Sequence, residues 1–187
     1  MPPPLSMKMK ELPERKHPRL KQYDYSQAGY YYITIHLADN SAPLSVIGRG
    51  STSAEYEISL TSVGVLVQQQ FLALETSYPN VKIDRYVIMP THIHAIIRLL
   101  ESAGASPRPT LMTVIGAFKS LTTRAYNASR KTSGQKLFQT SFYETVLRNE
   151  TAYVECCRYI DENPLKWWLK AEENNKPGNN GKNKPQP

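Results

Sequence analysis

The sequence is poor in cysteine and has no long apolar run. The first shortage argues against a disulfide-linked or zinc-knuckle protein, and the second argues against a membrane-spanning one. Its 187 residues include two cysteines, which are adjacent at Cys156 and Cys157. Adjacent cysteines suit neither a structural disulfide nor a zinc knuckle, so we expect a reducing, cytoplasmic environment. No apolar run reaches the ~20 residues of a membrane-spanning helix, and residues 1–16 lack the apolar centre of a signal peptide, so we expect no membrane insertion.

Positive charge is in excess. The chain carries 23 Lys and Arg against 16 Asp and Glu, a formal net charge of +7, with a pI of about 9.4. This balance favours a polyanionic partner, with nucleic acid first and an anionic membrane surface second. The length is that of one domain and is enough to bury a core.

The two ends of the chain differ in composition from its middle. Residues 1–14 are rich in proline and polar side chains, and residues 171–187 have no apolar residue beyond their first alanine. Neither segment can bury enough surface to offset the entropy lost on ordering. We therefore predict tails at residues 1–14 and 170–187 and one folded domain at residues 15–169.

Runs rich in β-branched and aromatic residues predict three strands, with a weaker one after the first. The three strands are expected at residues 30–38, 81–89 and 92–100. The weaker strand is expected in residues 44–50 or 54–60, forming a hairpin with the first.

Helical periodicity and capping residues predict three helices. They are expected at residues 61–78, 110–130 and 149–163. The last should stop by Asn163, because a proline such as Pro164 disfavours helical geometry in the residue before it. The order of these elements predicts an α+β fold, a ferredoxin-like split βαβ sandwich with an added C-terminal helix.

The chain has four histidines, and two of them, His92 and His94, lie one residue apart in an apolar run. Side chains alternate along a strand, so both imidazoles and Arg98 share one face and could converge on a metal ion. They could equally be two histidines on a half-covered strand face, since two ligands do not make a site. The opposite face is apolar and should contact the core: Ile93, Ala95, Ile97 and Leu99.

The last predicted helix has an apolar stripe and a more polar one. The apolar stripe is expected to contain Tyr153, Cys157, Ile160 and Val154. Tyr159 and Asn163 are i, i+4 neighbours on the polar side, where a hydroxyl could lie beside a metal that the amide helps to hold. The pattern equally fits a half-exposed tyrosine and an asparagine that merely ends the helix.

Four segments, taken in chain order, resemble motifs of the HUH-type single-strand tyrosine transposases, which include small insertion-sequence transposases and their REP-associated relatives. "VIMPTHIHAIIRL" resembles the His-hydrophobic-His signature of this family. The other three segments are "RLKQYDYSQAGYYYITIHL", "IGAFKSLTTRAYN" and "LFQTSFYETVLRNETAYVECCRYIDENPLKW". The resemblance spans about residues 15–167. One departure is Phe138, which stands where the family motif has tryptophan.

The resemblance implies a site. It implies that Tyr159 is the catalytic tyrosine, carried by the added C-terminal helix, and that His92, His94 and Asn163 hold a divalent metal, Mg²⁺ or Mn²⁺. Two imidazoles suit Mn²⁺ better, whereas cellular abundance favours Mg²⁺. Asparagine at position 163 is as in the REP-associated branch, whereas many mobile-element members have glutamine.

The implied activity is that of a metal-dependent transposase or nickase acting on single-stranded DNA. It would cleave and rejoin DNA near hairpins through a 5′-phosphotyrosine intermediate. Two alternatives stay open: a domesticated hairpin-binding protein with little or no catalysis, and a metal-dependent nuclease that activates water. A homodimer and a monomer are both compatible with the sequence, and so is use of Tyr159 in its own subunit or in a partner.

Basic and aromatic side chains supply candidate contacts to single-stranded or hairpin DNA. Taken singly, each could equally be a solvated charge or a packed ring. The candidates are Arg15, Lys16, Arg19, Lys21, Lys119, Arg124, Tyr143 and Arg148.

Overall fold

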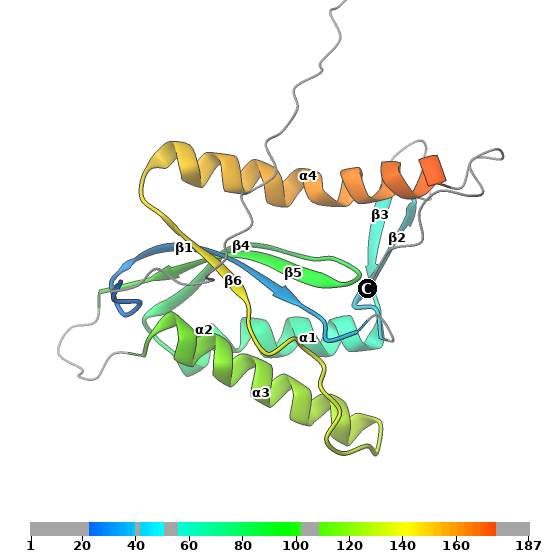
Figure 1. The fold of residues 1–187 in the computed structure, drawn as a ribbon, viewed down its shortest axis with the longest axis horizontal. Helices are drawn as coiled ribbons and strands as arrows, with labels where there is room; N and C mark the ends of the chain where they lie inside the picture. Colours follow the sequence, from blue (N-terminus) through cyan, green and yellow to red (C-terminus); the bar gives the residue numbers. More distant parts are fainter. Residues whose placement is uncertain (1–22, 40–41, 51–55, 102–108, 175–187) are drawn as a thin grey trace, which may run out of the picture.

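A four-stranded antiparallel sheet forms the centre of the molecule (Figure 1). The computed structural model describes residues 23–39, 42–50, 56–101 and 109–174. The strand order is β4-β5-β1-β6. The four strands are β1 (Gly29–His36), β4 (Val81–Ile88), β5 (His92–Leu99) and β6 (Tyr143–Leu147).

Helices cover both faces of this sheet. On one side lie α1 (Ser62–Leu72), the short α2 (Leu74–Ser77) and α3 (Leu111–Ser129), and on the other lies α4 (Glu150–Asn174) (Figure 1). The units β1–α1–β4 and β5–α3–β6 interleave, so that each has a strand of the other between its own two strands. This confirms the predicted α+β, ferredoxin-like sandwich with an added C-terminal helix.

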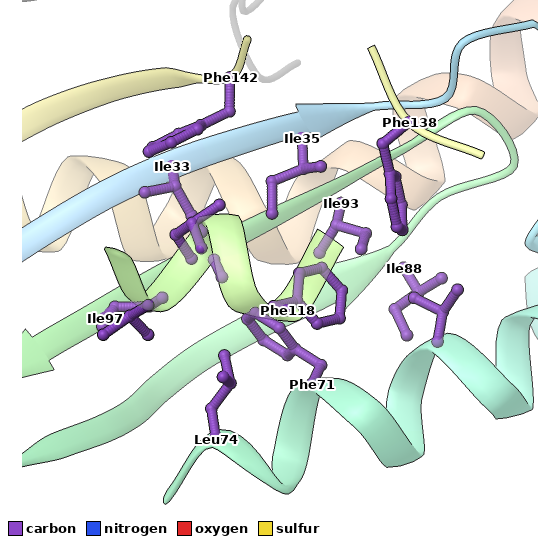
Figure 2. Packing of buried hydrophobic residues seen from close by; sticks show 14 of the residues in the cluster. Ile33, Ile35, Phe71, Leu74, Ile88, Ile93, Ile97, Phe118, Phe138 and Phe142 are labelled. Atoms are coloured by element: carbon purple, nitrogen blue, oxygen red, sulfur yellow. The ribbon is translucent and has the colours of Figure 1, made fainter. Parts of the chain in front are cut away.

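The main core fills the space between the sheet and helices α1 and α3. Figure 2 shows isoleucines of β1 and β5 pointing toward the aromatic rings of Phe71 and Phe118. The Phe71 and Phe118 rings meet edge to face with centroids 5.2 Å apart, a preferred arrangement for aromatic pairs. Each fully buried side chain of this size contributes about 1.5–3 kcal/mol of transfer free energy.

The helices begin at the expected polar residues. Thr61 Oγ1 accepts a hydrogen bond from the Gly64 amide at 3.0 Å, and Thr110 Oγ1 accepts one from the Thr113 amide at 3.2 Å. Asn149 Oδ1 accepts one from the Ala152 amide at 2.8 Å. Each bond satisfies an amide of the first turn that has no partner within its own helix, as a cap does.

The last helix continues well past its predicted end. α4 runs through Pro164 to Asn174, so the prediction that it stops by Asn163 was wrong, and helix occupies the start of the segment 170–187 that was expected to be a tail. Pro164 leaves the Ile160 carbonyl without its usual intrahelical donor. The proline is buried, and α4 also contacts the hairpin formed by β2 and β3. Packing therefore outweighs the local preference against helix.

Two further expectations need correction, and one strand was not predicted. β2 (Ser45–Arg49) and β3 (Tyr56–Leu60) pair with each other in a separate sheet, not with the first strand. β6, which the sequence did not predict, lies beside β1 instead. It has a charged residue at a buried position, Glu144, whose carboxylate accepts a hydrogen bond from the Tyr25 hydroxyl at 2.8 Å. Val154 is 45% exposed and is not part of the buried stripe of α4.

Among the described residues, none of the helices combines the length and the apolar character needed to cross a membrane.

Gly64 should be intolerant of any side chain. A Cβ at this position would lie 1.8 Å from the Leu44 carbonyl oxygen, which belongs to fixed backbone. We expect Gly64→Ala to lower the free energy of unfolding by about 3 kcal/mol, the upper end of the usual cost of overpacking. Urea unfolding monitored by circular dichroism measures this change.

Gly116→Ala in α3 is the matched control, because a Cβ there meets nothing within 4 Å. It should be neutral or stabilise the protein by up to about 1 kcal/mol, since alanine is the better helix former. Equal destabilisation by the two substitutions would show that helical context, and not the contact with Leu44, sets the effect.

Candidate active site

The predicted histidine pair lies on the face of the sheet that α4 covers. β1 and β5 pair so that Thr34 is opposite His94 and His36 is opposite His92. Directly paired residues point to the same face, so β1 adds hydroxyl and imidazole groups to the pair. Side chains of the other face of β5 lie in the main core, as predicted: Ile93, Ala95, Ile97 and Leu99.

Within the described part of the chain, one ring nitrogen of His94 has hydrogen-bond partners and the other has none. Its Nδ1 lies 2.7 Å from the Tyr32 hydroxyl and 2.9 Å from Thr34 Oγ1. Its Nε2 is buried and has no hydrogen-bond partner among the described residues. An unpartnered buried polar atom is unfavourable, costing about 1–3 kcal/mol, and calls for an explanation.

His92 lies between His94 and a third imidazole. Its ring centroid is 4.4 Å from that of His94 and 5.2 Å from that of His36. Its Nδ1 is 3.0 Å from Thr91 Oγ1. As in His94, a hydroxyl group lies at Nδ1, which orients the ring and leaves Nε2 as the nitrogen available to a ligand.

Burial keeps these imidazoles neutral. It lowers the pKa of His94 to about 2, with smaller contributions from His92 and His36. Burial, followed by the effect of His36, lowers the pKa of His92 to about 4, and burial lowers the pKa of His36 as well. All three are uncharged at neutral pH, and the neutral imidazole is the form that binds metals.

Helix α4 brings Tyr159 to this group. The Tyr159 ring centroid is 5.2 Å from that of His94 and 6.2 Å from that of Tyr32, edge-on to both. Asn163 follows one helical turn later and is half-buried. Tyr159 and the histidine pair belong to the same chain.

Apolar contacts hold α4 against the sheet. Cys157 and Ile160 form a second buried cluster with Tyr32, Ile96 and Leu147.

Two side-chain bonds tie α4 to the edge strand β4. The Tyr153 hydroxyl donates to Asp84, and the Arg85 Nε lies 3.0 Å from an Asp161 oxygen. The ion pair is solvent-exposed and contributes little to stability, so it fixes orientation more than it adds free energy.

His92 and His94 would need a ligand of another type to hold a divalent metal. The described residues hold no group of three or more His, Cys, Asp and Glu side chains arranged for a metal ion. A third ligand would therefore have to be of another type, and an amide oxygen such as that of Asn163 qualifies. Two imidazoles and an amide oxygen suit Mn²⁺, and Mg²⁺ less well.

The other predicted DNA contacts fall in different places. Tyr143 is on β6, 53% exposed, with its ring 6.0 Å from that of His36. Arg148 is exposed between β6 and α4. Lys119 donates hydrogen bonds to the Thr140 and Ser141 carbonyls. Four more candidates lie outside the described residues: Arg15, Lys16, Arg19 and Lys21.

Lys119 and the exposed Arg124 are both on α3, across the sheet from the histidines (Figure 1). The structure therefore brings Tyr143 to the histidine face and leaves Lys119 and Arg124 on the other side.

Sequence reasoning missed the contribution of β1. Tyr32, Thr34 and His36 all contact the histidine pair. The signal was present, because strand alternation puts these three residues on one face, but their role depends on the strand pairing. Trp167 was also missed, since its helical position depends on α4 passing Pro164.

The strand order and the helix across the second face define a ferredoxin-like fold with an added tyrosine-bearing helix. No protein-family model matches the chain. Its fold is shared by a solved REP-associated tyrosine transposase bound to a REP hairpin, with a TM-score of 0.58 and 21% identity, covering 81% of this chain and 76% of that chain.

Two further comparisons are more limited. An uncharacterized protein of Haemophilus influenzae (strain Rd) is 29% identical over 170 residues, which cover 82% of this chain and 89% of the relative. The crystal structure of a candidate transposase from Deinococcus radiodurans R1 has a TM-score of 0.44 and 14% identity, covering 77% of this chain and 95% of that chain. The second likeness is too distant for a comparison of sites.

Stability should fall as the histidines are forced to take up protons. Their pKa values are lower in the folded chain than the ordinary value of 6.5, so the unfolded state binds protons first. The free energy of unfolding should be constant above about pH 7.5 and should begin to fall as the pH approaches 6.5. At pH 5 it should be lower by about 2 kcal/mol for each of His92 and His94.

Urea unfolding at pH 7.5 and pH 5.0, with a chelator present to remove metal, measures this loss. The double variant His92→Gln/His94→Gln cannot take up these protons and should show a much smaller difference between the two pH values. An unchanged difference in the double variant would mean that other groups cause it.

Proposed function

We propose that the protein is a metal-dependent transposase or nickase of single-stranded DNA, with Tyr159 as its nucleophile. The observation that carries this proposal is the position of the Tyr159 ring beside His94, whose buried Nε2 has no partner. The ordered family motifs and the fold shared with a REP-associated tyrosine transposase support it. The proposed substrate is hairpin DNA with unpaired flanks.

Two tyrosines lie beside His94, and their surroundings separate their roles. Tyr32 is 5% exposed, its hydroxyl lies against His94 Nδ1, and burial raises its pKa. It is therefore shielded from a DNA phosphate and suited to orienting the imidazole. Tyr159 is half-buried on the helix that borders the site, where its hydroxyl can meet a phosphate.

His92, His94 and Asn163 are the proposed holders of Mn²⁺ or Mg²⁺. When bound there, a divalent ion supplies Lewis-acid polarisation of a phosphate oxygen and stabilisation of developing negative charge. Tyr32, Thr34 and Thr91 fix the two imidazoles through their Nδ1 atoms, which sets the orientation of both ligands in advance.

The proposed reaction conserves the energy of the phosphodiester bond. The Tyr159 oxygen gives up its proton to solvent and attacks the scissile phosphorus. A bond forms from phosphorus to the Tyr159 oxygen, and the bond from phosphorus to the 3′ oxygen breaks. The released 3′ oxygen takes up a proton, and the 5′ end stays attached to Tyr159 as a phosphotyrosine. A 3′-hydroxyl attacking the same phosphorus reverses the step and rejoins DNA.

Binding should come mainly from the DNA backbone. The net charge of +7 favours phosphate contacts that weaken steeply with salt. Tyr143 is exposed near the histidines, and Arg148 is exposed after the other end of β6. The basic residues before position 23 are further proposed contacts. Since Tyr159 and His94 meet within one chain, we propose that Tyr159 acts in its own subunit.

Tyr159→Phe should abolish the covalent protein–DNA adduct. The substitution removes one oxygen and keeps the ring, so the variant should fold and bind hairpin DNA as the wild type does. The measurement is a denaturing gel after incubation with a labelled hairpin oligonucleotide and Mn²⁺.

Tyr153→Phe and Tyr143→Phe are the matched controls, and both should still form the adduct. Tyr32→Phe should form it more slowly, because His94 loses one orienting hydroxyl. An adduct that persists in Tyr159→Phe and maps to another tyrosine would overturn the assignment of the nucleophile. Cleavage by the wild type with no adduct would favour the nuclease that activates water, and binding without cleavage under any ion would favour the hairpin-binding protein.

His92→Ala and His94→Ala should abolish metal-dependent cleavage and leave most of the DNA affinity. Phosphate contacts elsewhere carry that affinity, whereas each imidazole is one of few metal ligands. Cleavage assays with Mn²⁺ and Mg²⁺, calorimetric titration of Mn²⁺ and DNA-binding assays separate these effects. Asn163→Ala should behave in the same way but lose less metal affinity, and Asn174→Ala, at the end of the same helix, should change nothing. Parallel loss of DNA binding and cleavage in a folded variant would contradict the metal assignment.

A further inference from the structure

A row of four aromatic rings crosses the site from the edge of the sheet to α4. The Tyr143 ring on β6 lies 6.0 Å from the His36 ring on β1. The His36 ring lies 5.2 Å from the His92 ring on β5. The His92 ring in turn lies 6.1 Å from the Trp167 ring on α4. The strands β6, β1 and β5 are neighbours in the sheet, so the row runs across the strands.

The two outer rings of this row are open to solvent. Tyr143 is 53% exposed and Trp167 is 36% exposed. Residues that anchor α4 on the same face are buried completely or nearly so, with Ile96 at 0% and Ile160 at 2%. Tyr143 and Trp167 each touch one histidine and leave much of the ring uncovered. Exposed aromatic surface is what the stacking of an unpaired base requires.

Helical spacing puts Trp167 in line with the proposed catalytic groups. Tyr159, Asn163 and Trp167 are related by i, i+4, i+8 and so share one stripe of α4. The continuation of the helix through Pro164 keeps Trp167 in this stripe. Lys170 follows within the next turn and is exposed, which places a cation close to where a DNA backbone would pass.

We propose that Trp167 and Tyr143 stack unpaired nucleobases on opposite sides of the scissile phosphate, with His36 and His92 forming the floor between them. This proposal rests on the proposed function, and it adds the path of the DNA strand through the site. Stacking on aromatic rings recognises an unpaired base of any sequence, because every base has a π-face. A paired base is already stacked within its duplex, so the two rings would select single-stranded DNA beside the hairpin.

The test uses a Tyr159→Phe background, so that binding is measured without cleavage. The probe is a hairpin oligonucleotide with unpaired flanks, prepared as a series in which one abasic nucleotide steps through the flanks. Dissociation constants come from fluorescence anisotropy. Trp167→Ala and Tyr143→Ala should each weaken binding of the intact probe about 10-fold, as expected for the loss of one stacked base.

The position of the abasic nucleotide distinguishes stacking from general damage. In the parent protein, two separate flank positions should be sensitive to loss of the base. Trp167→Ala should abolish the sensitivity at one of them and Tyr143→Ala at the other. Trp167→Phe should restore most of the affinity, whereas Trp167→Leu, which keeps apolar cover on His92, should not. Leu169→Ala is the matched control, since Leu169 is 50% exposed on the same helix, and it should leave all affinities unchanged.

Failure of this proposal can be told apart from failure of the proposed function. If the wild type forms the Tyr159 adduct and binds the probe, but the variants keep every abasic sensitivity, the stacking proposal alone is wrong. If the wild type neither binds the probe nor forms an adduct, both proposals are wrong. Equal weakening at all flank positions in Trp167→Leu and Trp167→Phe would also overturn the stacking role.

Discussion

The antiparallel pairing of β1 with β5 is the constraint on which the site depends. Its register sets Thr34 opposite His94 and His36 opposite His92, which gives each imidazole its neighbours. A slip of one residue would turn every side chain of β5 to the other face and send both histidines into the main core. The apolar residues that alternate with them prevent such a slip, because Ile93, Ala95 and Ile97 are almost fully buried between sheet and helices.

The second constraint is the docking of α4. A tyrosine on an undocked helix would have no defined distance to the sheet. Cys157 and Ile160 pack on Ile96, and this packing fixes the distance between α4 and the sheet. The contact of α4 with the β2–β3 hairpin supports its distal half. Together with the burial of Pro164, this contact offsets the local preference against helix and keeps Trp167 on α4 beside His92. The proposed nucleophile and the proposed stacking ring therefore depend on the same packing surface.

Local pattern was sufficient for much of this structure. The alternation around His92 predicted its strand and both of its faces, and Thr61 and Thr110 predicted helix starts, because these signals lie within a few residues of the features they define. The prediction was wrong or incomplete where contacts between residues far apart in the sequence determine the structure. β6 has the buried Glu144, which is accommodated by Tyr25 far away in sequence, and α4 passes Pro164 because of the hairpin beneath it. Strand alternation placed His36 on the same face as Tyr32 and Thr34, but its role could not be predicted locally, because it comes from lying opposite His92.

The site face of the sheet divides into two halves with opposite energetic character. Around Ile96 it is apolar and close-packed, which stabilises the fold. Two residues away on the same strand face, His94 is 4% exposed with an unpartnered Nε2, and this burial disfavours folding by an amount comparable to one lost hydrogen bond. Another isoleucine at this position would avoid the cost. The same helix covers both halves. The packing free energy of Ile160 and Cys157 therefore offsets the cost of burying the His94 imidazole with no hydrogen-bond partner at Nε2 in the described part of the chain. This loss of stability at one defined atom, beside Tyr159 and near the exposed Trp167, is the cost that the proposed ligand at His94 Nε2 would offset.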